Sequence, residues 1–103
     1  IEMWGVKANL ITKGSVISPK INKLISKLKL HPLTKFTHQF TPHGVTGFVI
    51  LQESHLSIHT WPELLYVHME VLTCSKDVRF SVLDSLIESQ FSPEYYEIAE
   101  LIY

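Results

Sequence analysis

The amino-acid sequence predicts an α+β fold, a two-layer sandwich with two helices on one face of a mainly antiparallel sheet. Its 103 residues suffice for one hydrophobic core and not for two, so residues 1–103 are expected to form a single domain. Two segments carry apolar residues at helical spacing, and five others are rich in β-forming residues. Their order, β-α-β-β-β-α-β, favours an antiparallel sheet with the helices gathered on one side.

The N-terminal part is expected to contain a strand followed by a helix. Residues 3–12 are rich in β-forming residues and end at the turn signal of residues 13–15. Ser18 suits the N-cap of a helix, and Pro19 suits its first position. Beyond them, apolar residues recur over residues 21–28 at the i, i+3, i+4, i+7 spacing of one buried stripe.

The middle of the chain is expected to supply three strands. The first covers residues 34–40 and the third covers residues 64–74. The second begins with residues 45–53. Both of its faces are apolar, as in a central strand that is covered on both sides. Gly47 marks a close approach to its backbone. From His55 onward the pattern changes, because apolar residues now alternate with a polar and aromatic set that consists of His55, Ser57, His59 and Trp61.

The third of these strands repeats this division into two faces. Its odd positions 65, 67, 69 and 71 are apolar, and the opposite set contains Tyr66, His68, Glu70 and Cys74. Ser81 with Asp84 resembles a capping box that opens a second helix, whose inward residues are Leu83, Leu86 and Ile87. Residues 94–103 suit a last strand.

One face of this sheet is left without helices to cover it. The face carries histidine, tryptophan, tyrosine and phenylalanine side chains, and monomeric proteins rarely expose so much aromatic surface. We therefore expect a second copy of the chain to cover it by two-fold symmetry, which gives a homodimer.

Composition narrows the classes of partner. The net charge is -1, with 9 basic against 10 acidic residues, so the chain lacks the positive surface that nucleic-acid binding requires. One cysteine cannot form an internal disulfide, which favours a reducing compartment. No apolar run approaches the length of a membrane span, and the first residues lack the plan of a signal peptide. We expect a cytoplasmic protein that binds neither nucleic acid nor membrane.

Simple motifs do not explain the hairpin that ends at Cys74. His55 and His59 have the spacing of a metal pair on a helix, but on a strand they lie about 13 Å apart, too far for one ion. Ser54 beside His55 lacks the glycine-flanked turn of a hydrolase nucleophile. A lone cysteine such as Cys74 is more often a small buried residue than a reactive thiol.

The combination of these residues is more specific. Residues 44–63 read GVTGFVILQESHLSIHTWPE, and residues 67–74 read VHMEVLTC. In order and spacing they resemble the pyruvoyl-dependent S-adenosylmethionine decarboxylases of the short prokaryotic type. The resemblance is strongest over residues 36–74, and the flanking segments agree in pattern.

This resemblance implies a proenzyme that cleaves itself between Glu53 and Ser54. Ser54 would be the pyruvoyl precursor: its hydroxyl attacks the preceding carbonyl to give an ester, and elimination and hydrolysis leave a pyruvoyl group and ammonia. His59 matches the processing base of the family, and Thr46, where the family usually has serine, would hold the developing oxyanion. The pyruvoyl group would then form a Schiff base with the substrate amine, so no metal and no pyridoxal phosphate are expected.

The resemblance also implies the remaining site residues. Cys74 matches the proton donor of the family. Phe40 matches an aromatic residue that stacks on adenine, Trp61 lies where the family lines the nucleoside pocket, and Glu63 matches the carboxylate that binds the ribose hydroxyls. The implied reaction converts S-adenosylmethionine to its decarboxylated form and CO₂ for spermidine and other polyamines, at sites on the interface of a homodimer of processed two-chain protomers.

Two other functions remain open at this point. A pyruvoyl-dependent arginine or ornithine decarboxylase would keep the same scaffold and the same chemistry. An unprocessed homologue would act as a noncatalytic regulatory subunit of an active partner. Phe40, Trp61 and Glu63 argue against the first alternative. The presence of Ser54, His59 and Cys74 argues against the second.

Overall fold

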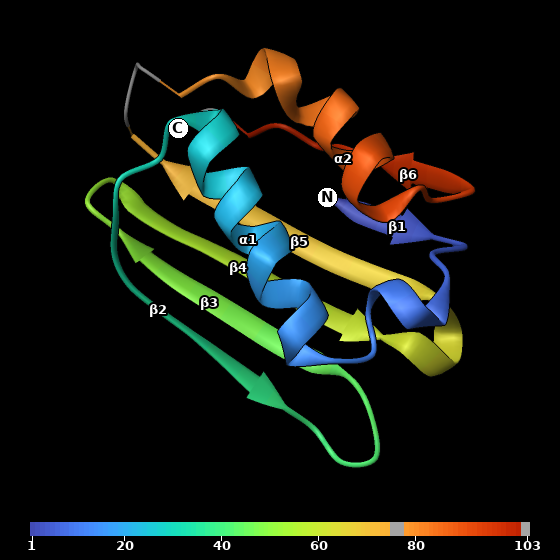
Figure 1. The fold of residues 1–103 in the computed structure, drawn as a ribbon. Helices are drawn as coiled ribbons and strands as arrows, with labels where there is room; N and C mark the ends of the chain where they lie inside the picture. The colour runs from blue at the N-terminus through green and yellow to red at the C-terminus, as the bar shows by residue number, and fades with distance from the viewer. Residues whose placement is uncertain (75–77, 102–103) are drawn as a thin grey trace.

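The computed structural model describes residues 1–74 and 78–101 as two layers (Figure 1). A six-stranded antiparallel sheet has the order β2-β3-β4-β5-β1-β6, and both helices lie on one face of it. The predicted α+β sandwich is therefore confirmed. The strands and helices are β1 (Glu2–Trp4), α1 (Gly14–Leu28), β2 (Pro32–Gln39), β3 (Val45–Leu51), β4 (Ser54–Trp61), β5 (Tyr66–Thr73), α2 (Leu83–Phe91) and β6 (Tyr95–Glu97).

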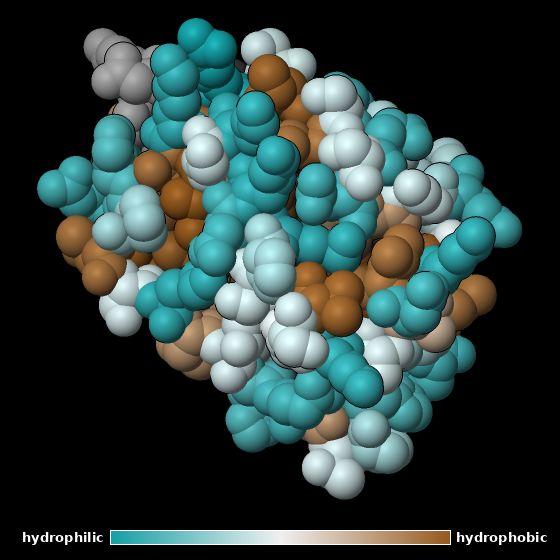
Figure 2. Space-filling model, viewed as in Figure 1, coloured by the Kyte–Doolittle hydropathy of each residue, from teal (hydrophilic) through white to brown (hydrophobic). Residues whose placement is uncertain are grey.

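The hydrophobic core lies between the helices and the sheet. The stripe predicted on α1 is buried, and so are the three inward residues of α2. The core takes one alternating set of side chains from each of β3, β4 and β5. On the outside, hydrophilic side chains follow α1, with apolar side chains visible on either side of it (Figure 2). Within the described residues, no helix is both long and apolar enough to cross a membrane.

The sheet has one strand more than the predicted order, because the second of the three middle strands is two strands. The chain turns back at residues 52–53, so that β3 and β4 pair from Thr46 with His59 to Ile50 with His55. The core-facing side of β3 is buried as predicted, but its other side is only partly covered within one chain, and Ile50 is 42% exposed. Only the helical layer covers this strand.

The predicted first strand is wrong over most of its length. The strand β1 ends at Trp4, the chain turns at Gly5, and residues 8–10 form a 3₁₀ turn. Gly5 has a φ of +70°, a conformation that favours glycine and interrupts an extended chain. The apolar side chains that suggested a strand are nevertheless buried, since Val6 and Ile11 belong to the core.

The N-cap of the first helix lies five residues before the predicted one. Lys13 is the N-cap and makes no side-chain capping bond; instead, the Gln39 side chain on β2 accepts the N–H of Gly14 at 2.7 Å. Ser18 therefore lies inside the helix, where its hydroxyl accepts a hydrogen bond from Lys35 at 2.9 Å. The contact with Gln39 thus supplies the hydrogen-bond acceptor for the helix N-terminus that the local sequence lacks.

The capping box predicted for the second helix is also absent. The N-cap of α2 is Val82, which makes no side-chain capping bond, and a 3₁₀ turn of residues 80–82 precedes it. Asp84 instead accepts a hydrogen bond from the Tyr96 hydroxyl at 2.8 Å. The predicted last strand shortens to Tyr95–Glu97, and residues 102–103 lie outside the described residues.

The sheet face opposite the helices is uncovered, and we call it the open face. It carries Phe36, Phe48, His55, His59, Trp61, Tyr66 and His68, which the strand registers place side by side. The predicted polar and aromatic set of β4 lies here, as expected from its alternation. Phe36 is 55% exposed and Trp61 is 39% exposed.

Candidate active site

The predicted cleavage site lies where the β3–β4 hairpin meets the end of β5. Ser54 is the first residue of β4 and pairs with Thr73. Its φ is +156°, which is uncommon for a residue that is not glycine. Unusual backbone angles of this kind are retained only where the surrounding structure holds them.

Cys74 contacts the carbonyl oxygen of the predicted scissile bond. Its thiol Sγ lies 3.4 Å from the Glu53 oxygen, and its backbone N–H donates to the same oxygen at 3.4 Å. The N–H contact is long for a hydrogen bond, whereas the sulfur distance is ordinary. Three residues that the sequence singled out, Glu53, Ser54 and Cys74, therefore lie together, and Cys74 is exposed to solvent.

The side chain of Glu53 has a separate partner. Its Oε1 hydrogen-bonds with Nδ1 of His31, and this bond lowers the pKa of the carboxyl group below its ordinary value. The carboxyl is 10% exposed, and among the described residues its Oε2 is buried without a hydrogen-bond partner. Sequence reasoning missed His31, which carried no signal except its place before a proline at the end of a helix.

A second cluster lies at the other end of β4. Register pairs Thr46 with His59, and the Thr46 hydroxyl lies 2.9 Å from His59 Nδ1. The imidazole of His59 lies between Trp61, at 6.1 Å between ring centroids, and His68, at 6.5 Å. When Nδ1–H donates to the Thr46 oxygen, Nε2 carries the free lone pair, so this contact can orient the histidine as a base.

The residues predicted to bind the substrate lie toward the same end of β4 as His59. Phe40 follows the end of β2, 48% exposed, with its ring 4.5 Å from that of His38. Trp61 ends β4, with its ring 5.4 Å from that of Tyr66. Glu63 follows in a 3₁₀ turn, and its Oε2 lies 3.2 Å from Nε2 of His43.

One chain does not bring the two clusters together. Ser54 and His59 are five residues apart on one extended strand, which separates them by about 17 Å at about 3.4 Å per residue. The candidate site therefore consists of two parts: the Ser54 cluster of Glu53, Ser54 and Cys74, and the His59 cluster, consisting of Thr46, His59 and the substrate residues Phe40, Trp61 and Glu63.

Further titratable groups lie on the open face between and beside the clusters. His55 Nε2 lies 2.7 Å from Glu70 Oε1, and this hydrogen bond lowers the pKa of Glu70. The Tyr66 hydroxyl donates to Glu2 at 2.7 Å. Burial, followed by that hydrogen bond, raises the pKa of Tyr66 to about 12. Within residues 1–74 and 78–101, no group of three His, Cys, Asp or Glu side chains is placed to hold a metal ion.

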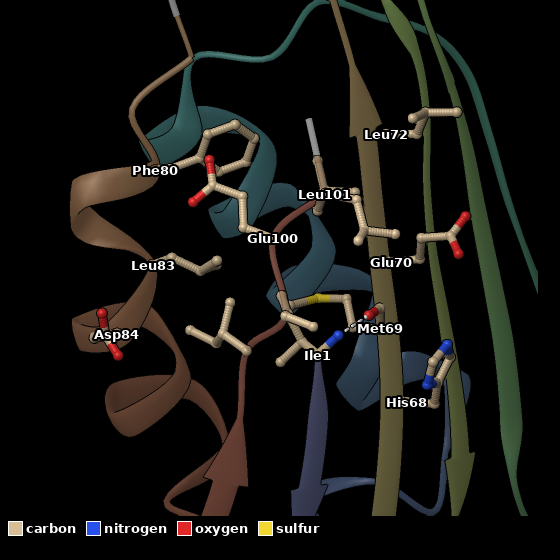
Figure 3. A pocket seen from close by; sticks show the side chains of 13 residues that line it. Ile1, His68, Met69, Glu70, Leu72, Phe80, Leu83, Asp84, Glu100 and Leu101 are labelled. Atoms are coloured by element: carbon tan, nitrogen blue, oxygen red, sulfur yellow. Dashed lines mark hydrogen bonds between the residues drawn. The ribbon is translucent and has the colours of Figure 1, made fainter. Parts of the chain in front are cut away.

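A cavity of about 510 Å³ lies between β5, α2 and residues 98–101 (Figure 3). Phe80, Leu83 and Leu101 line it together with Glu70 and Glu100. None of the predicted site residues lines this cavity. The predicted residues lie instead along β4 and the segments next to it.

Comparison with known proteins identifies the family. The sequence profile described as S-adenosylmethionine decarboxylase matches residues 1–102. The chain belongs to the S-adenosylmethionine decarboxylase family. A member from Archaeoglobus fulgidus, an S-adenosylmethionine decarboxylase proenzyme, is 39% identical over 95 residues, which cover 92% of this chain and 85% of that protein. A proenzyme of the same name from Methanococcus maripaludis is 35% identical, over 98% of this chain and 83% of its own length.

A solved structure agrees with this membership of the S-adenosylmethionine decarboxylase family. The crystal structure of the adenosylmethionine decarboxylase from Aquifex aeolicus superposes with a TM-score of 0.82 at 33% identity, covering 91% of this chain and 78% of that one. The name proenzyme is consistent with a prosthetic group made from the chain itself. The residues present suit such a pyruvoyl group, because a serine follows a carbonyl that Cys74 contacts.

Proposed function

We propose that the chain is a self-processing, pyruvoyl-dependent decarboxylase that converts S-adenosylmethionine to decarboxylated S-adenosylmethionine and CO₂ for polyamine synthesis. Membership of the family supports the substrate. The observation that carries the proposal is the contact of Cys74 with the Glu53 carbonyl, because it brings the expected proton donor to the expected cleavage site.

Self-cleavage begins at the peptide bond between Glu53 and Ser54. The Ser54 Oγ attacks the Glu53 carbonyl carbon, the C–N bond breaks, and the hydroxyl proton passes to the released nitrogen, so that an ester replaces the amide. The Cys74 N–H and thiol point at the oxygen that becomes negative during attack. The unusual φ of Ser54 supports this site, since a strained backbone raises the energy of the bond that is to be broken.

The next step requires a base that removes the Cα proton of Ser54. The electrons left on Cα break the bond between Cβ and the ester oxygen, which releases the main chain of Glu53 with a new C-terminal carboxylate. Hydrolysis then releases ammonia and leaves the pyruvoyl group at residue 54. His59 is the expected base, but within one chain it is about 17 Å away. A two-fold axis near Ser57, in the middle of β4, would place His59 of a second copy opposite Ser54.

We therefore propose a homodimer in which the open faces of two copies pack together, with the helices outside. Thr46 and His59 from one copy would then complete the Ser54 cluster of the other, twice per dimer. The exposed aromatic residues on the open face support this arrangement, because burying them removes a large apolar surface from water.

Decarboxylation uses the same residues after cleavage. The pyruvoyl group supplies an electron sink for the electrons released as CO₂ leaves. Cys74 delivers a proton from its thiol, which lies beside residue 54 in the structure. Phe40 and Trp61 offer aromatic faces to the adenine and to the sulfonium cation, and Glu63 accepts hydrogen bonds from the ribose.

The mass of the denatured protein tests the cleavage that this function requires. We expect the unaltered chain to give two fragments, residues 1–53 and residues 54–103, the second beginning with a pyruvoyl group. Ser54→Ala should remain intact, and Ser57→Ala, which removes the same hydroxyl three residues along β4, should still cleave. One intact chain in every sample would overturn the proposal. A decarboxylation assay of the cleaved protein with S-adenosylmethionine, arginine and ornithine then identifies the substrate.

A further inference from the structure

His31 contacts the segment before the proposed cleavage site at two points. It lies between the end of α1 and the start of β2, far from the substrate residues of its own chain. Its carbonyl oxygen accepts the N–H of Gln52 at 2.9 Å, and its Nδ1 hydrogen-bonds with the Glu53 carboxylate. One residue therefore holds both members of the short connection between β3 and β4.

These contacts fix the acyl side of the bond. Glu53 is held by His31 through its side chain and by Cys74 through its carbonyl oxygen. Attack by the Ser54 hydroxyl requires this carbonyl to keep one orientation relative to Ser54 Oγ, and small misplacements of reacting atoms are costly. The φ of +156° at Ser54 likewise requires neighbours that prevent it from relaxing.

The charge of Glu53 gives His31 a second effect. Its carboxylate belongs to the residue whose carbonyl oxygen becomes negative during the attack, and it is only 10% exposed. Two negative charges a few ångströms apart repel each other, and more strongly than in bulk water when one of them is partly shielded from solvent. A hydrogen bond from His31 to the carboxylate draws negative charge toward the imidazole and reduces this repulsion.

We propose that His31 is a positioning residue for self-cleavage, which acts on the bond between Glu53 and Ser54 by holding the Glu53 carboxylate. It touches neither the substrate nor the reacting atoms. This inference rests on the proposed function, because it assigns a role in the cleavage that the function requires.

The rate of self-cleavage tests the role of His31. The full-length chain and its variants are synthesised in vitro, and the disappearance of the intact chain is followed by mass. His31→Ala should slow cleavage about 10- to 100-fold, as expected when a hydrogen bond to a charged group is lost. His31→Asn places an amide N–H near the position of Nδ1, and should restore the rate to within about threefold of the unaltered chain.

Two controls test whether the slower cleavage of His31→Ala is specific to this residue and whether it arises from lost stability. Tyr96→Phe removes another hydrogen bond to a carboxylate, that of Asp84 on α2 at 2.8 Å, which belongs to neither cluster, and should leave the cleavage rate unchanged. Urea unfolding of each variant in the uncleavable Ser54→Ala background measures stability separately. We expect His31→Ala and His31→Asn to unfold at similar urea concentrations although they cleave at different rates.

The outcomes distinguish the two proposals. If the unaltered chain does not cleave, the proposed function fails. If it cleaves and His31→Ala cleaves at the same rate, only the role of His31 is refuted. Equal slowing by His31→Ala and His31→Asn, in proportion to a loss of stability, would also refute it, because the histidine would then serve the fold alone.

Discussion

At the scale of single residues, the decisive contact is that of Cys74 with the Glu53 carbonyl oxygen. The thiol lies 3.4 Å from this oxygen, so one side chain borders the bond that we propose is cleaved and the residue on which we propose the pyruvoyl group forms. The backbone N–H of Cys74 contacts the oxygen independently of the side chain. The two reactions should therefore respond differently to loss of the thiol.

We expect Cys74→Ala to cleave itself and to decarboxylate poorly. The N–H remains to polarise the carbonyl, whereas the acid that protonates the product is gone, and positioned acids typically contribute about 10²- to 10⁴-fold. The measurement is CO₂ release per cleaved subunit, with Cys74→Ser as the control that keeps a weaker donor. Turnover equal to that of the unaltered chain would remove Cys74 from the mechanism.

Tyr66 should be the last of the described tyrosines to ionise. Burial and the hydrogen bond to Glu2 raise its pKa from 10.0 to about 12. The neutral form is favoured by folding, so its contribution to stability is complete below pH 10.0 and is lost as the pH rises toward about 12. Ultraviolet titration should show a late step that is absent in Tyr66→Phe and occurs at lower pH in Glu2→Gln. A late step that survives in Tyr66→Phe belongs to another residue.

At the scale of secondary structure, α1 packs closely on β3 at Gly47. A Cβ at this position would lie 2.5 Å from Cδ1 of Ile21 on the helix and 2.9 Å from Cγ2 of Ile58 on β4. The absence of a side chain therefore sets how closely the helix approaches the sheet, as the sequence predicted for this glycine.

We expect Gly47→Ala to destabilise the chain by about 1–3 kcal/mol through overpacking. Ile21→Val removes the Cδ1 atom that a new Cβ would meet first, so the cost of Gly47→Ala should be smaller by about 1 kcal/mol in that background. Urea unfolding of the four members of this cycle, all carrying Ser54→Ala so that the chain stays whole, measures the difference. Equal costs in both backgrounds would show that Ile21 does not set the helix distance.

The periodic features of the elements could be predicted from sequence, and their ends could not. Alternation placed His55, His59 and Trp61 on one face, because the period of a strand is a local property. The start of α1 depends on Gln39, which is 25 residues away from Gly14, and no local pattern reports such a contact. The contact of His31 with Glu53 is hidden for the same reason. The roles assigned to the site residues stay predictions.

At the scale of the whole molecule, the two clusters of the candidate site lie at opposite ends of β4. Within one chain, the predicted base His59 and the substrate residue Trp61 lie at the other end of β4 from Ser54, with His59 about 17 Å away along the strand. In the proposed dimer, a second copy that covers the open face by two-fold symmetry would bring the two ends together. Sedimentation that shows only monomer at micromolar concentration would refute this arrangement.

Mixing two inactive variants tests the shared site directly. Ser54→Ala and His59→Ala should each remain uncleaved alone. When the two chains are refolded together, roughly half of the His59→Ala chains should be cut, for random pairing, because each mixed dimer joins one intact Ser54 to one intact His59. The Ser54→Ala chain should stay whole. A mixture in which neither chain is cut would show that the base does not come from the partner.

The strand order has a further consequence for a chain cut between Glu53 and Ser54. The strand β1 belongs to the first fragment but lies between β5 and β6 of the second, so the fragments are interleaved and hold each other in one sheet. Folding of the uncut chain is unimolecular, whereas two separated fragments must first collide. Once unfolded, the mature protein would refold slowly, at a rate that rises with its concentration. Its working lifetime would therefore be governed by the height of its unfolding barrier and not by an equilibrium.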